Sequence, residues 1–154
     1  MITAQKIFNQ KPVALIVGGG SFLGSFLAEA LLLEGCRVVF LDNLDSQKQK
    51  SLEKCFQNKD FVFLEYQAGN LLPAEIKNQE IFYIFDLIAE EILSFQLWQL
   101  AEEKKAKILV VASESFPWDV FTKKFPKVDF RIIRLSNVYG PRMEIKNPQD
   151  LKEK

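Results

Sequence analysis

The chain has 154 residues, of which 48% are apolar and 14 are Phe. A chain of this length and composition forms one domain and buries a core without disulfides or metal ions, which argues against intrinsic disorder. Its 20 basic and 20 acidic residues cancel, so there is no basic excess to attract nucleic acid. The absence of histidine excludes a histidine general base and a histidine-ligated metal, and we expect no metal site.

The sequence also indicates where the protein resides. No apolar stretch reaches the length of about 18 residues that a membrane span requires, and Met1–Lys11 lacks the apolar core of a signal peptide. Cys36 and Cys55 form no Cys-x-x-Cys pair, which favours two free thiols in a reducing compartment. We therefore expect a cytoplasmic protein that contacts no membrane.

In the first half of the chain, short apolar runs alternate with helical patterns. Val13–Val17 is an apolar run that ends at Gly18, which predicts a buried strand and a tight turn. Apolar residues then recur at helical spacing from Phe22 to Leu31, and Gly35 suits the end of that helix. The next predicted elements are a strand over 37–41, a polar helix over 46–56 and a strand over 61–64.

The second half continues the alternation. Ile81–Phe85 predicts a strand buried on both faces, and Glu91–Lys105 predicts a helix with several apolar residues. Lys107–Ala112 and Phe130–Leu135 predict two further strands, and Ser113–Asp129 between them has room for one short helix.

Strands that alternate with helices predict an α/β fold with a parallel sheet. Right-handed crossovers place helices on both faces, so we expect a Rossmann-like, doubly wound, three-layer α/β/α domain of about six strands in the order 3-2-1-4-5-6. The whole chain, 1–154, is predicted to be one dinucleotide-binding domain, with its core over 12–143 and a flexible polar tail over 144–154.

The glycine-rich turn after the first strand carries the clearest chemistry. Gly18 allows the sharp turn, small side chains at Gly20 and Ser21 leave room for a pyrophosphate, and Gly24 allows close packing of the helix on the strand. The following helix offers free N–H groups and the positive end of its dipole to phosphates. The predicted cofactor-binding residues of this turn are Gly18, Gly20, Ser21, Phe22, Leu23 and Gly24.

An acidic residue follows at the expected place. Asp42 lies at the tip of the second strand, beside Asn43, where a carboxylate can accept hydrogen bonds from both hydroxyls of an adenosine ribose. The alternative is a glycine turn that serves only packing between helix and strand, with Asp42 as a simple turn residue.

Several segments together resemble a known family. They are Val17–Ser25 (VGGGSFLGS), Val38–Leu44 (VVFLDNL), Phe85–Ala89 (FDLIA), Leu109–Ser113 (LVVAS) and Arg134–Arg142 (RLSNVYGPR). In this order they resemble the extended short-chain dehydrogenase/reductases, which include the NAD-dependent sugar-nucleotide epimerases and dehydratases. The resemblance implies NAD as the cofactor, with Ile88 and Gln67 added to the residues that bind it.

The chain departs from this family at three positions near the cofactor. Ser21 replaces the middle glycine of the turn, and Gln67 takes roughly the place of an aspartate that contacts adenine. Asp86 replaces a histidine after strand four. A carboxylate there would repel a pyrophosphate unless it points away or pairs with a cation.

The family's catalytic pair has no match here. The family uses a Tyr with a Lys four residues later, assisted by a Ser or Thr, and Ser113 matches only that helper. Trp118, Lys123 and Lys124 follow it without forming the pair, and Tyr139 belongs to the NVYGP segment, where packing is the favoured role. The family's second domain, which holds the sugar nucleotide, is also not found.

Three functional interpretations remain open. The first is a catalytically impaired NAD-binding domain that acts as a binding module or as half of a site completed by another chain. The second is an active NAD-dependent epimerase, dehydratase or reductase that uses unusual residues, with Ser113, Lys123 or Lys124, and Asp86 as candidates. The third is a structural remnant that binds nothing.

The helix over 91–105 suggests a homodimer. A single sheet does not cover Phe95, Leu97 and Trp98 together, and the matching helix of the family packs against a second subunit. The alternative is that the segment 113–129, which is rich in aromatic residues, folds over this helix instead.

Overall fold

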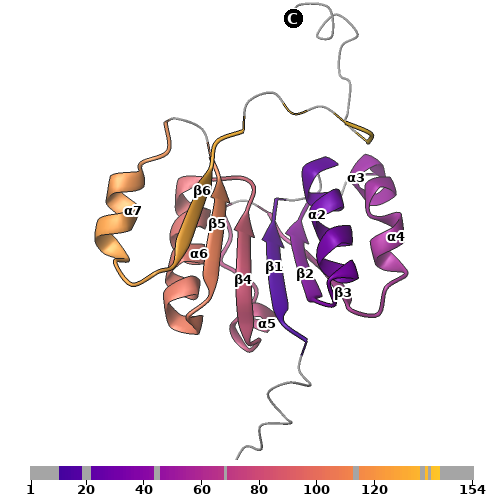
Figure 1. Ribbon diagram of the computed structural model, residues 1–154, viewed down its shortest axis with the longest axis horizontal. Coiled ribbons are helices and arrows are strands. Elements are labelled where there is room, and N and C mark those ends of the chain that lie inside the picture. The colour runs from indigo at the N-terminus through magenta and orange to yellow at the C-terminus, as the bar shows by residue number, and fades with distance from the viewer. Residues whose placement is uncertain are drawn as a thin grey trace, which may run out of the picture.

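Six parallel strands form one sheet in the order β3-β2-β1-β4-β5-β6 (Figure 1). The computed structural model describes residues 11–18, 22–43, 46–67, 69–112, 115–135, 138 and 140–142. For residues 46–48 it describes the backbone only. The strands are β1 (Val13–Val17), β2 (Arg37–Asp42), β3 (Phe61–Glu65), β4 (Ile81–Asp86), β5 (Lys107–Val111) and β6 (Phe130–Ile133). The predicted Rossmann-like fold and its strand order are confirmed.

The helices are α2 (Phe22–Leu33), α3 (Ser46–Ser51), α4 (Glu53–Phe56), α5 (Ala74–Lys77), α6 (Glu91–Lys104) and α7 (Trp118–Lys124). The single helix predicted over 46–56 is interrupted at Leu52, whose side chain is fully buried. The sequence did not predict α5, because four residues with one buried side chain, Ile76, show no periodicity. The short helix expected between β5 and β6 is α7.

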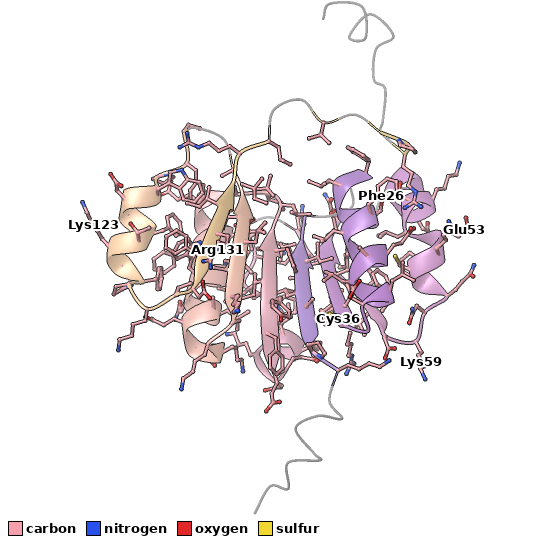
Figure 2. The ribbon with its side chains drawn as sticks, in the orientation of Figure 1. Phe26, Cys36, Glu53, Lys59, Lys123 and Arg131 are labelled. Carbon is pink, nitrogen blue, oxygen red and sulfur yellow. The ribbon has the colours of Figure 1, made fainter. Side chains whose placement is uncertain are left out.

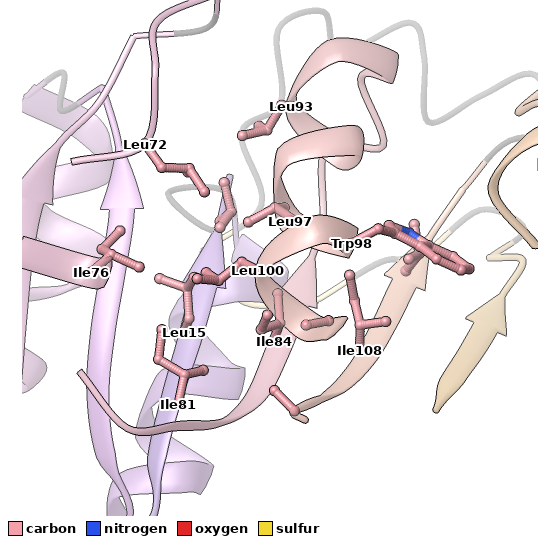
Figure 3. Close-up of a cluster of buried hydrophobic side chains, with 14 of the residues drawn as sticks. Leu15, Leu72, Ile76, Ile81, Ile84, Leu93, Leu97, Trp98, Leu100 and Ile108 are labelled. Atoms are coloured by element: carbon pink, nitrogen blue, oxygen red, sulfur yellow. The ribbon is translucent and has the colours of Figure 1, made fainter. Parts of the chain in front are cut away.

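Two apolar clusters hold the three layers together. One lies between the sheet and α6, where Leu93 and Leu97 pack with Leu15, Ile84 and Ile108 (Figure 3). The other lies on the opposite face of the sheet, where Ile16, Val38 and Phe40 pack with Ala28 of α2, with Leu52 and with Cys55 of α4. Because β1 contributes to both clusters, all five of its residues are buried, which explains its unbroken apolar sequence.

The prediction that β4 is buried on both faces is wrong. Phe82 is 49% exposed and Tyr83 is 38% exposed, and the pairing with β1 shifts register there, since Val13 pairs with Ile81 and Ala14 with Tyr83. Helix α2 contacts β1 and β2, whereas α6 contacts β4 and β5 from the other side. An apolar sequence shows that a strand can be buried, but the helix positions decide which of its residues are.

The apolar residues of α6 are covered within the chain. Trp98 is fully buried, and its ring centroid lies 5.4 Å from that of Phe121 and 6.2 Å from that of Phe125. Phe95 lies 5.2 Å from Phe125. The segment after β5 therefore folds over α6, which is the alternative to a homodimer that the sequence left open. The apolar residues of this helix are thus explained without a second subunit.

Three further findings concern the described part of the chain. None of its helices is long and apolar enough to cross a membrane. It contains no group of three or more Cys, Asp or Glu residues that could hold a metal ion. Cys36 and Cys55 are buried and unpaired, and burial raises the pKa of the Cys55 thiol to about 11, so this thiol stays protonated at neutral pH.

Trp98→Ala should lower the free energy of unfolding by about 3–5 kcal/mol, because Trp98 is fully buried among the rings of Phe121 and Phe130. Denaturant unfolding followed by circular dichroism measures the change. Val120→Ala removes a side chain that is 56% exposed and should stay within about 0.5 kcal/mol of the wild type. Equal effects of the two substitutions would contradict this account of the core.

Candidate functional site

The carboxyl ends of three adjacent strands meet where the strand order reverses. From β1 the chain goes on to β2 on one side, and β4 lies on the other. The Gly18 N–H donates to the Leu41 carbonyl of β2 at 2.9 Å, and the Leu87 N–H donates to the Val17 carbonyl at 3.0 Å. In open parallel sheets the crevice outside this reversal is the usual place for a ligand.

Gly18 has two separate reasons to be glycine. Its φ of 77° lies in the left-handed region, which side chains disfavour. A Cβ built on it would also come within 1.9 Å of Cγ1 of Ile88. The loop after β4 thus lies directly against the turn after β1, and two residues predicted to bind the cofactor are in contact. Gly20 and Ser21, predicted for the same turn, lie outside the described residues.

Helix α2 begins at Phe22, directly after this turn. Gly24 and Ser25 in its first turns are buried, while Phe22 and Leu23 are half-buried. The first turn contains no acidic residue. The first turn, which carries the positive end of the helix dipole, therefore has no carboxylate of its own to oppose an anion.

The remaining predicted residues end the neighbouring strands. Asp42 is the last residue of β2 and is only 6% exposed, and its carbonyl accepts a hydrogen bond from the Tyr66 N–H at 2.9 Å. Asn43 follows it, and Gln67 lies exposed just after β3. Gly18, Asp42, Gln67 and Ile88 therefore come from the ends of β1, β2, β3 and β4, at one edge of the sheet.

Asp86 points into the protein, away from the crevice. Its side chain is fully buried, and Oδ1 accepts hydrogen bonds from the N–H groups of Ile88 at 3.2 Å and Ala89 at 2.9 Å. Oδ2 accepts the hydroxyl of Ser94 on α6. Burial raises the pKa of this carboxyl, although its hydrogen bonds oppose the rise. The carboxylate therefore fastens the loop that places Ile88 on Gly18.

The segment after β6 returns to α2, a contact that the sequence did not predict. A Cβ on Gly140 would come within 2.7 Å of the Phe22 ring. Nη1 of Arg142 lies 2.7 Å from Oε1 of Glu29 and 3.3 Å from Oγ of Ser25, and its guanidinium lies 4.4 Å from the centre of the Phe26 ring. The sequence shows that segment 134–142 resembles the family, but no pattern in it predicts that Arg142 pairs with Glu29.

The catalytic candidates do not assemble into a pair among the described residues. Ser113 and Tyr139 lie outside that part of the chain. Nζ of Lys124 lies 4.7 Å from the centre of the Phe95 ring, and Lys123 is exposed on the same helix. The Tyr66 hydroxyl donates to the Asn70 carbonyl at 2.8 Å, and burial raises its pKa, so it is neither free nor acidic enough to act as a base.

Comparisons with known proteins agree with this arrangement. The profile of the NAD dependent epimerase/dehydratase family matches residues 14–111. The Bordetella bronchiseptica enzyme WbmH, solved with NAD+, superposes with a TM-score of 0.68 at 16% identity over 92% of this chain and 61% of its own. WbmG from the same organism, solved with NAD, gives 0.66 at 18% identity over 89% and 57%.

A third structure extends the comparison to a sugar-nucleotide enzyme. The UDP-glucose 4-epimerase of Thermotoga maritima, solved with UDP-glucose, has a TM-score of 0.66 at 19% identity over 86% of this chain and 58% of its own. At such identities the likeness shows the shared fold. This chain spans about three-fifths of the length of each of these enzymes.

Asp86→Asn should make the protein more stable than the wild type as pH rises from 4 to 8. The pKa of the Asp86 carboxyl is raised in the folded protein. Its contribution to stability is therefore fully present below the pKa that this carboxyl has in the unfolded chain, and it is lost as pH rises through the folded-state pKa. The amide keeps an acceptor for Ile88 and Ala89 and can donate to Ser94 without a buried charge. Urea unfolding across this pH range measures the difference.

Asp86→Ala is the matched variant, because it removes the acceptor of the Ile88 and Ala89 N–H groups. It should lower stability at every pH, since buried donors lose their partner. A difference between Asp86→Asn and wild type that does not change with pH would show that burial of the charge has no role.

Proposed function

Because the chain belongs to the NAD-dependent epimerase/dehydratase family, we propose that it binds NAD at the carboxyl edge of its sheet. The observation that carries the proposal is the turn at Gly18, where a left-handed glycine lies against Ile88 at the reversal of strand order. Helix α2 begins at Phe22, a few residues after Gly18, and the N-terminus of a helix suits a pyrophosphate.

Each predicted residue then has a distinct role. The turn and first helical residues, Gly18, Gly20, Ser21, Phe22, Leu23 and Gly24, hold the pyrophosphate. Asp42 and Asn43 receive the adenosine ribose, and Gln67 contacts the adenine. Ile88 supplies an apolar contact, and Asp86, through its bonds to the loop after β4, positions it. These assignments are supported by the fold, because the residues lie at the carboxyl ends of β1, β2, β3 and β4, on the same side of the sheet.

The absence of a Tyr-Lys pair suggests a domain that binds the cofactor without turning over a substrate. When bound, NAD would supply a hydride acceptor, but a reaction also needs a base near neutral pH beside the substrate hydroxyl. Neither described tyrosine, Tyr66 or Tyr83, has a Lys four residues later, and the chain has no histidine. We propose a single binding domain over 1–154, or half of a site that another polypeptide completes.

NAD should bind more tightly than NADP. The 2′-phosphate of NADP would meet the carboxylate of Asp42, and two anions in contact repel each other. Arg37 begins the same strand and lies five residues back, about 16 Å at 3.3 Å per residue, so it cannot compensate. Calorimetry with both dinucleotides measures the two affinities. Equal or tighter binding of NADP would contradict the role of Asp42.

Two matched variants distinguish the effect of the Asp42 carboxylate from the effect of removing any one negative charge. Asp42→Asn should weaken NAD binding and narrow the difference between the two dinucleotides. Asp60→Asn removes a carboxylate just before β3, at the amino ends of the strands and away from the proposed site. There Asp60 pairs with Lys11 at 2.5 Å. It should leave both affinities unchanged.

The protein alone should neither oxidise nor epimerise sugar nucleotides. The assay follows NADH absorbance at 340 nm with a panel of UDP- and dTDP-sugars, and tests for epimerised products. Saturable NAD binding without turnover is the expected result. Turnover that disappears in Ser113→Ala would contradict it and would favour a working enzyme with unusual catalytic residues. Absence of any NAD binding would instead favour a structural remnant.

A further inference from the structure

The chain that leaves β6 returns to the other half of the sheet. Strand β6 ends at Ile133 and is separated from β1 by β5 and β4, which amounts to three strand spacings or about 14 Å. Gly140, seven residues later, already lies against Phe22 of α2, the helix that packs on β1 and β2. The last described residues, yellow in Figure 1, therefore lie across the reversal of strand order from β6.

Arg142 attaches this end of the described chain to α2. Its Nη1 lies 2.7 Å from Oε1 of Glu29 and donates to Oγ of Ser25 at 3.3 Å. Its guanidinium lies 4.4 Å from the centre of the Phe26 ring, a favourable place for a cation. Both side chains of the ion pair are only 23% exposed, so salt and water screen it less than a surface pair. We call these three contacts of Arg142 the Arg142 anchor.

The backbone of Arg142 indicates that the anchor is a specific contact. Its φ of 71° lies in the left-handed region, which residues with a side chain disfavour. Such conformations persist where the surroundings hold them, and they gather at ligand sites and switches. The contacts of the guanidinium with α2 supply that hold, so the anchor outweighs a local conformational cost.

The anchor acts on the first residue of α2. Ser25, which accepts the N–H of Arg142, donates its own hydroxyl to the Phe22 carbonyl at 2.8 Å. The ring of Phe22 lies against Gly140 on one side and makes an edge contact with Phe26, at 6.0 Å between centroids. Helix α2 begins at Phe22, so these contacts fix both the backbone and the ring of the residue at its N-terminus.

We propose that Arg142 is a positioning residue of the NAD site, because it fixes Phe22 and thereby holds the start of α2 in the arrangement that accepts the pyrophosphate. This inference rests on the proposed function. The charge of Arg142 is paired with Glu29, so Arg142 acts through α2. The anchor and the cofactor are then coupled, since a ligand that binds more tightly to the anchored form must favour that form by the same factor.

The first experiment measures the NAD affinity of Glu29→Gln and Arg142→Gln by calorimetry. Each substitution breaks the ion pair and should raise the Kd for NAD at least about fivefold, as expected for coupled sites. Glu29→Gln is the decisive variant. Loss of a negative charge near an anion should by itself strengthen binding, whereas loss of the anchor weakens it. The double variant Glu29→Arg with Arg142→Glu rebuilds the pair and should recover most of the affinity.

Arg131→Gln is the matched control. It also removes an arginine from an ion pair, since Arg131 lies 2.7 Å from Asp129, but this arginine is 74% exposed. Figure 2 shows Arg131 on β6 and Phe26 on α2, on opposite sides of β4 and β1. The NAD affinity of this variant should equal that of the wild type. A loss as large as that of Arg142→Gln would contradict a specific role of the anchor.

Limited cleavage by trypsin follows the anchor itself. The protease cuts between Arg142 and Met143 only when the arginine side chain is released. Glu29→Gln should speed this cut, and saturating NAD should slow it in the wild type relative to the cut after Lys123, which is exposed on α7. The inference is overturned, and the NAD site left intact, if Glu29→Gln binds NAD at least as tightly as the wild type or if NAD slows both cuts equally. A wild type that binds no NAD would overturn the proposed function as well.

Discussion

The contact between the turn after β1 and the loop after β4 is the constraint on which the proposed site depends. Gly18 adopts a left-handed conformation and leaves no room for a Cβ beside Ile88. The position of Ile88 depends in turn on Asp86, which accepts hydrogen bonds from Ile88 and Ala89 and from Ser94 of α6. A buried carboxyl on one face of the sheet thus holds the loop after β4 in place beside the turn after β1.

The strand order and the right-handed crossover together set the place of the site and the distribution of the helices over the two faces of the sheet. The chain leaves β1 toward β2 and returns on the far side to β4, and the reversal of strand order between them is where open parallel sheets usually bind a ligand. The right-handed crossover places α6 and α7 on the face of β4, β5 and β6 that lies opposite α2. Phe121 and Phe125 cover Trp98 within the chain, so the apolar residues of α6 are explained without a second subunit.

Local patterns in the sequence were sufficient for the fold and for the place of the proposed site in it. The strands β1 and β2, the glycine turn and the order of the sheet follow from apolar runs, glycine positions and the handedness of crossovers. The same patterns bring Gly18, Asp42, Gln67 and Ile88 to one edge, because the carboxyl ends of parallel strands always meet there. The roles of all these residues stay predictions; Gly20 and Ser21, predicted from the glycine pattern, and Ser113, implied by the family resemblance, also lie outside the described residues.

Only the tertiary structure decided which apolar residues are covered and where the charged ones point. Phe82 and Tyr83 belong to an apolar run and are nevertheless exposed, because the side chains of a strand are buried only where a helix lies on them. The orientation of Asp86 toward Ser94 and the pairing of Arg142 with Glu29 join residues far apart in the sequence or on different elements. Such contacts depend on how the layers pack, and the spacing of residues along the sequence does not determine the distance between layers.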